Sequence, residues 1–256
     1  MTKDLKNDGF LASDSPRLVI DFGNTMAKIA VFENGRIVEL STTESVNTGK
    51  LATLKEKFLL NHCIVSTVTT IVPEIKSFLE QNFNYTELNH RTRVPINNLY
   101  KTPETLGKDR LAAVVGAHAL FQKTNCLVID AGTCITFDFL DNQGNYQGGA
   151  ISPGINLRFK SLHTFTSRLP LINSKNFGGI IGKTTEESIL SGVLNGTVAE
   201  LNCTIQRYQE LFTGLQVLLT GGDMNFFDGK LKSNIFAAPN LVLTGLNEIL
   251  DFNAVI

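Results

Sequence analysis

The stretch VIDFGNTMAK, residues 19–28, decides the fold of this protein. An apolar run leads into Asp21, a turn follows at Gly23 and Asn24, and a second apolar run, IAVF, occupies residues 29–32. Glycine next to asparagine favours a tight turn between two antiparallel strands. The pattern therefore predicts a β-hairpin that carries a carboxylate on its first strand, just before the turn.

The same pattern returns in the second half of the chain. The stretch CLVIDAGTCITFDFLDNQGNYQGGAI, residues 126–151, repeats the order of strand, Asp-x-Gly, Thr, strand, turn and strand, and Asp130 takes the place of Asp21. The two aspartates lie 109 residues apart (130 − 21). A repeat with this spacing is too long for a solenoid unit and indicates two copies of one subdomain. We therefore expect an α/β protein with two similar lobes, residues 17–124 and 125–256, and a cleft between them.

Alternating strand and helix patterns occupy most of the remaining chain. Further strands are expected at 35–40, 63–70 and 215–222, and helices at 48–62, 72–83, 108–122 and 185–212. Residues 1–16 are polar and lack the apolar core of a signal peptide. We expect them to form a flexible N-terminal extension.

The composition argues against several classes of protein. The 256 residues are 43% apolar, which is enough for a large core, and 23 basic residues stand against 24 acidic ones. A balanced charge argues against a partner, such as nucleic acid or a membrane surface, that is held by a general basic field. The four cysteines form no Cys-x-x-Cys pair and show no zinc-finger spacing. These features predict a cytoplasmic protein with reduced thiols and a small-molecule site.

The two Asp-x-Gly turns have a shared chemistry. Glycine lets backbone N–H groups approach an anion closely, and Asn and Thr side chains add further donors. Aspartate repels phosphate, so we expect Asp21 and Asp130 to hold a cation or its water shell. An ordinary hairpin with an incidental Asp explains either turn alone. The occurrence of both turns in the same strand context favours a site that grips one polyphosphate.

The order of five short motifs resembles that of a known family. These motifs are DFGNTMAK (21–28), LGKDR (106–110), DAGTCITFD (130–138), GGAISPGI (148–155) and GGD (221–223). Their order and spacing are similar to those of the type III pantothenate kinases, and the resemblance runs from about residue 17 to the C-terminus. It implies two ribonuclease H-like lobes of the actin-like superfamily. It also implies phosphorylation of the primary hydroxyl of pantothenate by ATP to 4'-phosphopantothenate, the first step of coenzyme A biosynthesis.

The resemblance also implies cofactors, an assembly and site residues. The cofactors are a monovalent cation, potassium or ammonium, and the magnesium that accompanies ATP, and the assembly is a homodimer. Asp109 matches the catalytic base and Asp130 the ligand of the monovalent cation. The implied ATP contacts are Asp21, Phe22, Gly23, Asn24, Thr25, Met26, Ala27, Lys28 and Thr133. The implied pantothenate contacts are Tyr100, Gly107, Lys108, Asp109, Arg110 and Thr185, where Thr185 is preferred to Thr184 because it directly precedes the Glu-Glu-Ser of the next helix.

Plainer interpretations of these motifs remain open. Asp109 also suits the first turn of a helix, where a carboxylate complements the helix dipole by about 0.3 to 1 kcal/mol. Gly182-Lys183-Thr184 has the ending of a Walker A loop, but Phe177 stands where that loop needs its first glycine. Two other functions also remain: a kinase of the same superfamily with a different acceptor, and a nucleotide-binding regulator without turnover.

Overall fold

The computed structural model describes residues 15–173 and 175–254, so most of the expected N-terminal extension, residues 1–16, lies outside the described residues. The chain divides into two compact units. The first runs to residue 93 and includes residues from 246 onward, and the second comprises residues 94–245. The expected boundary after residue 124 therefore falls inside the second unit, because the helix at Lys108–Leu120 packs on strands of that unit.

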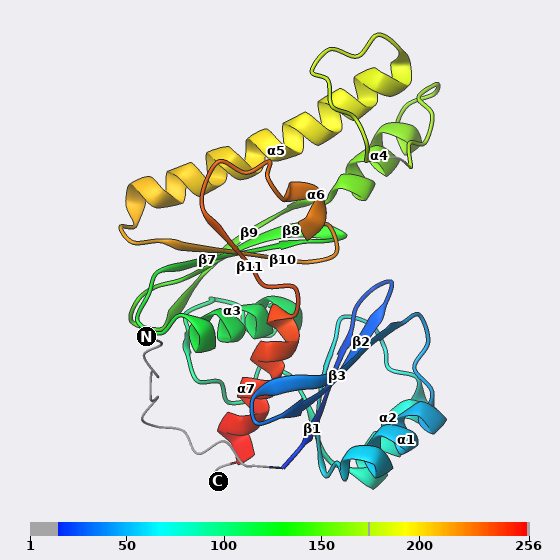
Figure 1. Cartoon of the computed structure of the whole chain (residues 1–256), viewed down its shortest axis with the longest axis vertical. Helices are drawn as coiled ribbons and strands as arrows, with labels where there is room; N and C mark the ends of the chain where they lie inside the picture. The colour runs from blue at the N-terminus through cyan, green and yellow to red at the C-terminus, as the bar shows by residue number, and fades with distance from the viewer. Residues whose placement is uncertain (1–14, 174, 255–256) are drawn as a thin grey trace, which may run out of the picture. The chain divides into compact units, whose positions relative to one another are not determined.

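The first unit is built on a five-stranded sheet in the order β3-β2-β1-β4-β5 (Figure 1). Its strands are β1 (Arg17–Phe22), β2 (Ala27–Glu33), β3 (Arg36–Thr43), β4 (His62–Thr67) and β5 (Asn84–Glu87). The first three are antiparallel, whereas β4 and β5 run parallel to β1. Leucines and isoleucines of α1 (Thr48–Phe58) and α2 (Pro73–Asn82) join the core that covers this sheet.

The second unit repeats this sheet. Its order is β11-β10-β7-β8-β9-β6, so β9-β8-β7-β10-β11 corresponds strand by strand to the first sheet, and β6 is added at the edge. The strands are β6 (Asn97–Asn98), β7 (Cys126–Ala131), β8 (Cys134–Leu140), β9 (Asn145–Pro153), β10 (Gln216–Thr220) and β11 (Ile235–Ala237). The directions also match, since β7, β8 and β9 are antiparallel and β10 is parallel to β7. The expected class of two similar α/β lobes is confirmed.

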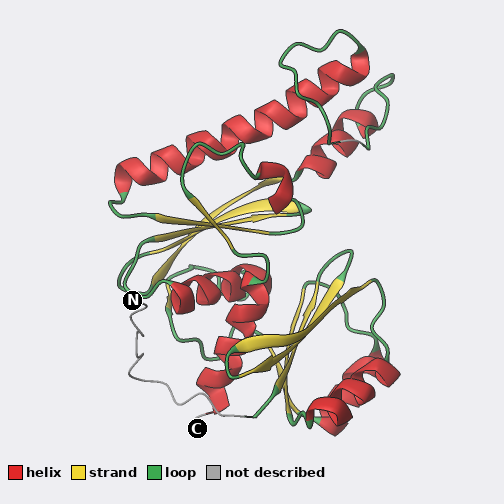
Figure 2. Ribbon diagram, in the orientation of Figure 1, coloured by secondary structure: helices red, strands yellow, loops and turns green. Residues whose placement is uncertain are grey.

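Helices cover both faces of the second sheet (Figure 2). The helices α4 (Ile155–Thr164), α5 (Thr185–Leu211) and α6 (Met224–Phe227) pack with the sheet in one large apolar core. The helix α3 (Lys108–Leu120) packs on β7 and β8. The first residues of α7 (Leu241–Ala254) cross α3 so closely that a Cβ at Gly245 would lie 1.7 Å from the carbonyl oxygen of Ala112. Within the described residues, no helix combines the length and apolar character that crossing a membrane requires.

The central strands β1 and β7 explain why the sequence folds in this way. Each begins with four buried residues, Arg17–Ile20 in β1 and Cys126–Ile129 in β7, because neighbouring strands and packed helices enclose both faces. A strand that is covered on both faces must be a nearly continuous apolar run. The fifth residue of each strand is a half-buried aspartate, Asp21 in β1 and Asp130 in β7, so each carboxylate follows a run of four buried residues.

Candidate active site

The two aspartates occupy equivalent positions in the two sheets. Asp21 lies opposite Lys28 of β2 and Ser66 of β4. Asp130 lies opposite Thr136 of β8 and Thr220 of β10. Each aspartate therefore stands at the same end of a central strand, between a hairpin partner and a parallel neighbour. The internal repeat that the sequence predicts extends to the level of single residues.

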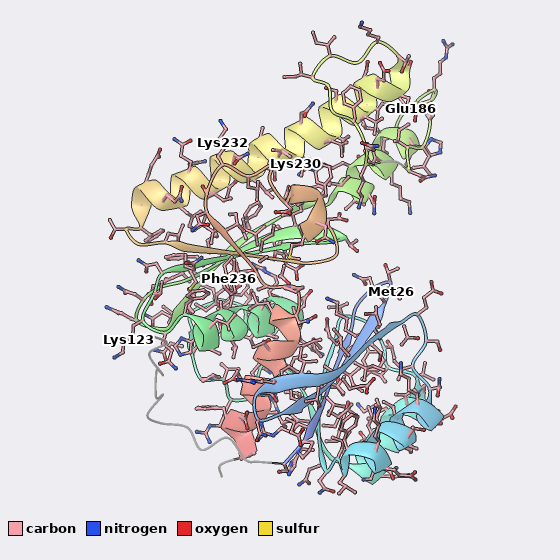
Figure 3. All side chains as sticks on the ribbon, viewed as in Figure 1. Met26, Lys123, Glu186, Lys230, Lys232 and Phe236 are labelled. Carbon is pink, nitrogen blue, oxygen red and sulfur yellow. The ribbon has the colours of Figure 1, made fainter. Side chains whose placement is uncertain are left out.

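The first turn lines a cavity of about 230 Å³. The N–H of Gly23 donates to the carbonyl oxygen of Met26 at 3.1 Å, which closes the turn between β1 and β2. Figure 3 shows Met26 at the tip of this hairpin. The cavity is lined by residues 22–27 together with residues 44–46 and 69–72 and Ile75. Six of the eight residues predicted to bind ATP in this stretch therefore face one hollow of the first unit.

The second turn is held by a loop that follows β9. The N–H of Gly132 donates to the carbonyl oxygen of Cys134 at 2.9 Å, and the N–H of Gly154 donates to that of Thr133 at 3.0 Å. Gly154 is buried, and a Cβ there would lie 2.1 Å from the carbonyl oxygen of Gly132. Only glycine allows this approach. The Thr133 side chain remains exposed at the end of the turn.

A glycine after β10 makes room for Asp130. Gly221 has φ +96°, and a Cβ on it would lie 2.5 Å from Oδ1 of Asp130 and 2.3 Å from the carbonyl oxygen of Ala131. The N–H of Asp223 donates to that same carbonyl oxygen at 2.8 Å, and the Asp223 carboxylate forms an ion pair with Lys175. The sequence pointed to this segment only through its Gly-Gly-Asp motif. Its contact with Asp130 depends on the parallel pairing of β10 with β7.

The predicted catalytic aspartate lies in the first turn of α3. Gly107 precedes the helix, and Oδ1 of Asp109 accepts a hydrogen bond from the backbone N–H of Arg110 at 2.9 Å. A Cβ at Gly107 would lie 2.6 Å from that oxygen, so the bare glycine leaves room for the carboxylate. Lys108 and Asp109 are both half-buried. The helix-start interpretation and a contact with substrate are compatible at this position.

Arg110 points into the protein. Its Nε and Nη2 atoms donate to Oδ1 of Asp138 at 3.0 and 2.6 Å, and the two side chains are 6% and 0% exposed. The hydroxyl of Tyr146 donates to the same Oδ1 at 2.6 Å. Burial lowers the pKa of the Arg110 guanidinium. The hydrogen bond to Asp138 and the negative charge of Asp138 raise this pKa by more, so it lies above its ordinary value. Burial first, and then the Asp138 charge, raise the pKa of Tyr146, so this hydroxyl keeps its proton.

Comparison with known proteins identifies the family. Residues 17–207 match the family model for type III pantothenate kinase. A type III pantothenate kinase from Phocaeicola vulgatus is 47% identical over 237 residues, which cover 92% of this chain and 98% of that protein. The chain belongs to the type III pantothenate kinase family.

Several solved structures resemble this family member in fold. A protein described as a Baf family transcriptional activator from Campylobacter jejuni superposes with a TM-score of 0.59 at 21% identity and covers 93% of this chain and 100% of its own. A glucokinase from an Antarctic psychrotroph gives a TM-score of 0.51 at 13% identity, covering 92% and 98%. At these identities the likeness concerns the fold alone.

One predicted pantothenate contact of this family member lies apart from the others. Thr185 is exposed at the start of α5 and lines a cavity of about 580 Å³ with Arg158 and apolar residues of α4 and α5. Figure 3 shows its neighbour Glu186 at the tip of the second unit, and Figure 1 shows that α3 lies at the opposite side of the sheet. Within one chain, Thr185 is not brought together with Asp109.

The Lys-Thr pair before α5 has a local role in this family member. The Thr184 hydroxyl accepts the N–H of Glu187 at 3.1 Å, and Oε2 of Glu187 accepts the N–H of Lys183 at 2.7 Å. This reciprocal pattern resembles a capping box. No strand leads into this segment among the described residues 175–184. The resemblance of this segment to a Walker A ending therefore reflects a helix cap.

The close packing of Gly154 on the second turn leads to a testable prediction. A methyl group in Gly154→Ala must displace the backbone of Gly132 and Thr133, because it cannot fit at 2.1 Å from a carbonyl oxygen. If Thr133 contacts nucleotide as predicted, the affinity for ATP, measured by calorimetric titration, should fall about tenfold or more. The matched control is Gly178→Ala, where a Cβ meets no atom within 4 Å among the described residues. Unchanged ATP affinity in Gly154→Ala would argue against a role for this turn.

Proposed function

We infer that this chain, acting in the cytoplasm, transfers the γ-phosphoryl group of ATP to the primary hydroxyl of pantothenate. The product is 4'-phosphopantothenate, and the reaction is the first step of coenzyme A biosynthesis. The observation that carries this conclusion is the family match over 191 consecutive residues, 17–207, which includes both Asp-x-Gly turns and the start of α3. The predicted pantothenate contacts Gly107–Arg110 lie within the matched residues.

The chemistry assigns a role to each part of the site. Phosphoryl transfer has a loose transition state, so catalysis rests mainly on positioning and on neutralising charge. The backbone N–H groups and side chains of the two turns, at Asn24 and Thr25 and at Thr133, would hold the phosphates of ATP. Asp109 would accept a hydrogen bond from the attacking hydroxyl, orient it and take its proton late in the reaction. A carboxylate of ordinary basicity suffices for this role.

Two alternatives give different results in one assay. A superfamily kinase with another acceptor would turn over ATP with a different small alcohol, acid or polyphosphate. A regulator would bind ATP without turnover. The retention of Asp21, Asp109 and Asp130 favours an enzyme over a regulator, and the presence of Tyr100 with the Gly107–Arg110 motif favours pantothenate over other acceptors.

One prediction concerns the reaction and its base. The wild-type protein should release ADP from magnesium ATP in potassium buffer only when pantothenate is present. Asp109→Asn should lower kcat by about a hundredfold or more, because the amide keeps the shape of the carboxylate but does not accept the proton. Calorimetric ATP binding should persist in that variant. Glu104→Gln, the same chemical change at an exposed carboxylate just before α3, is the control and should keep wild-type rates.

Three results would contradict parts of this proposal. Turnover of ATP with another acceptor would move the function to a different kinase. An absence of turnover across a panel of small alcohols, together with ATP binding, would favour the regulator. Wild-type kcat in Asp109→Asn would remove the catalytic role of that carboxylate while leaving the reaction in place.

We further propose that Asp130 is a ligand of a potassium or ammonium ion. The resemblance to the family and the half-buried carboxylate of Asp130 support this proposal, because hard cations take carboxylate oxygens as ligands. When bound, such a cation supplies positive charge near the phosphates of ATP. The magnesium that enters with ATP supplies further charge to the transferred group.

Exchange of the salt tests the cation proposal. Replacing potassium with sodium at constant ionic strength should lower kcat, because a site shaped for the larger ion binds the smaller one in a poorer geometry. Asp130→Asn should raise the potassium concentration for half-maximal rate about tenfold or more, because it removes the charged ligand. Asp228→Asn, a matched change at an exposed carboxylate, should leave the potassium response unchanged. Equal rates in both salts would exclude a selective site.

We also propose that the enzyme is a homodimer in which the segment between α4 and α5 takes part in the interface. Phe165, Ile180 and Ile181 in this segment are 84, 80 and 77% exposed. Large exposed apolar side chains of this kind favour a protein contact. A second copy seated here would lie next to Thr185, which one chain alone keeps away from Asp109. The homodimer would thereby account for the predicted role of Thr185.

Sedimentation velocity tests this assembly. The wild-type protein should sediment with the mass of two chains, and the double variant Ile180→Asp with Ile181→Asp should sediment as one, because two carboxylates would have to be buried in the interface. The control is Leu211→Asp, which changes a leucine that is 74% exposed at the far end of α5. A monomeric wild-type protein, or a dimeric double variant, would contradict the proposed interface.

A further inference from the structure

Two of the predicted pantothenate contacts, Tyr100 and Arg110, belong to a cluster of four polar side chains, three of which are buried. Arg110 of α3 and Asp138 of β8 form its centre, with both side chains almost completely removed from solvent. The guanidinium donates through two of its nitrogens, and Nε also lies 3.2 Å from the second carboxylate oxygen of Asp138. Tyr146 of β9 is 0% exposed and completes the cluster from a second strand with a hydrogen bond to Asp138.

The cluster also holds the ring of Tyr100. This ring lies parallel to that of Tyr146, with centroids 6.1 Å apart and an interplanar angle of 6°. The guanidinium carbon of Arg110 lies 5.6 Å from the centroid of the Tyr100 ring. On its backbone side, Tyr100 donates its N–H to the side chain of Asn98 at 3.0 Å. Tyr100 is half-buried, so one part of it is packed and another part remains accessible.

The stability of the protein does not by itself explain this cluster. Removing a guanidinium and a carboxylate from water costs several kcal/mol, and apolar side chains of the same volume often stabilise a core as well or better. A buried ion pair does fix geometry, because the bidentate arrangement allows the guanidinium few orientations. The residues fixed in this way are Arg110, which adjoins Asp109 in the chain, and Tyr100.

We propose that Asp138 and Tyr146 are positioning residues for the acceptor site, which hold the Arg110 guanidinium and the Tyr100 ring in place beside Asp109. This inference rests on the proposed function. Neither residue needs to touch pantothenate, because Asp138 is 0% exposed and Tyr146 presents its ring to Tyr100. Substitutions of Asp138 or Tyr146 should therefore change the KM for pantothenate and not the KM for ATP, because the cluster includes two predicted pantothenate contacts.

Two single variants and their combination test the proposal. Tyr146→Phe removes one hydroxyl and keeps the ring against Tyr100, so it should fold normally. It should raise the KM for pantothenate about five- to tenfold, because the loss of one hydrogen bond to a charged group loosens the pair. Asp138→Asn should lower kcat/KM for pantothenate about a hundredfold, because it leaves the Arg110 charge without its partner. The KM for ATP should stay within about twofold in both variants.

A double variant and a matched control separate positioning from general damage. If both residues act through Arg110, the combined effect of Asp138→Asn and Tyr146→Phe should be much smaller than the product of the single effects. Tyr85→Phe removes a hydroxyl that donates to another carboxylate, Glu87, at 3.2 Å in the first unit, and should leave both KM values unchanged. Circular dichroism and the melting temperature report folding separately from these kinetic constants.

The outcomes distinguish this inference from the proposed function. If the wild-type protein shows no pantothenate-dependent turnover, the proposed function itself fails. If the wild type turns over and the variants melt at lower temperature with unchanged KM values, the cluster is only structural and the inference is overturned. An equal rise of the KM for ATP and for pantothenate would also overturn it, because that result indicates a general distortion of the protein.

Discussion

The burial of the central strand in each sheet is the constraint on which the rest of the structure depends. In β1 and β7, four buried residues are followed by a half-buried aspartate. Because the two sheets share one strand order and one register, the two carboxylates and their glycine turns occupy matching positions. The order of the strands therefore determines where each Asp-x-Gly turn lies within its own unit.

The position of the predicted acceptor residues Asp109 and Arg110 depends on the packing of helix α3. Helix α3 is rich in alanine and valine, and most of its residues are buried against the sheet and α7. Its first turn carries the half-buried Asp109 next to Arg110, which lies in the interior. A helix turns by 100° per residue, so adjacent side chains point in different directions. The interior side chain can then hold the helix start in place, while the half-buried side chain stays accessible to a substrate.

Three glycines allow the backbone to approach predicted site residues closely. Gly154 supports the turn at Thr133, Gly221 leaves space beside Asp130, and Gly107 leaves space for the carboxylate of Asp109. Each of these glycines lies where a Cβ would meet a polar atom of a predicted site residue or its turn. The fold by itself does not specify this chemistry, since a glucokinase and a protein described as a transcriptional activator share it at low identity. The function of this family member follows from the family match over residues 17–207 and not from the fold.

The sequence by itself determined the features that depend on local pattern. The two hairpins, the equivalence of Asp21 and Asp130, the helices α1, α2, α3 and α5 and the position of Asp109 at a helix start all follow from short periodic segments and turn residues. Only the tertiary structure decided the assignment of α3 to the second unit, the short strands β5, β6 and β11, the burial of Arg110 against Asp138 and the separation of Thr185 from α3. These features join residues that are distant in sequence, and the pairing of strands and the packing of helices bring such residues together. A side chain's own neighbours in the sequence carry no signal for such a contact, which is why Asp138 and Tyr146 were missed.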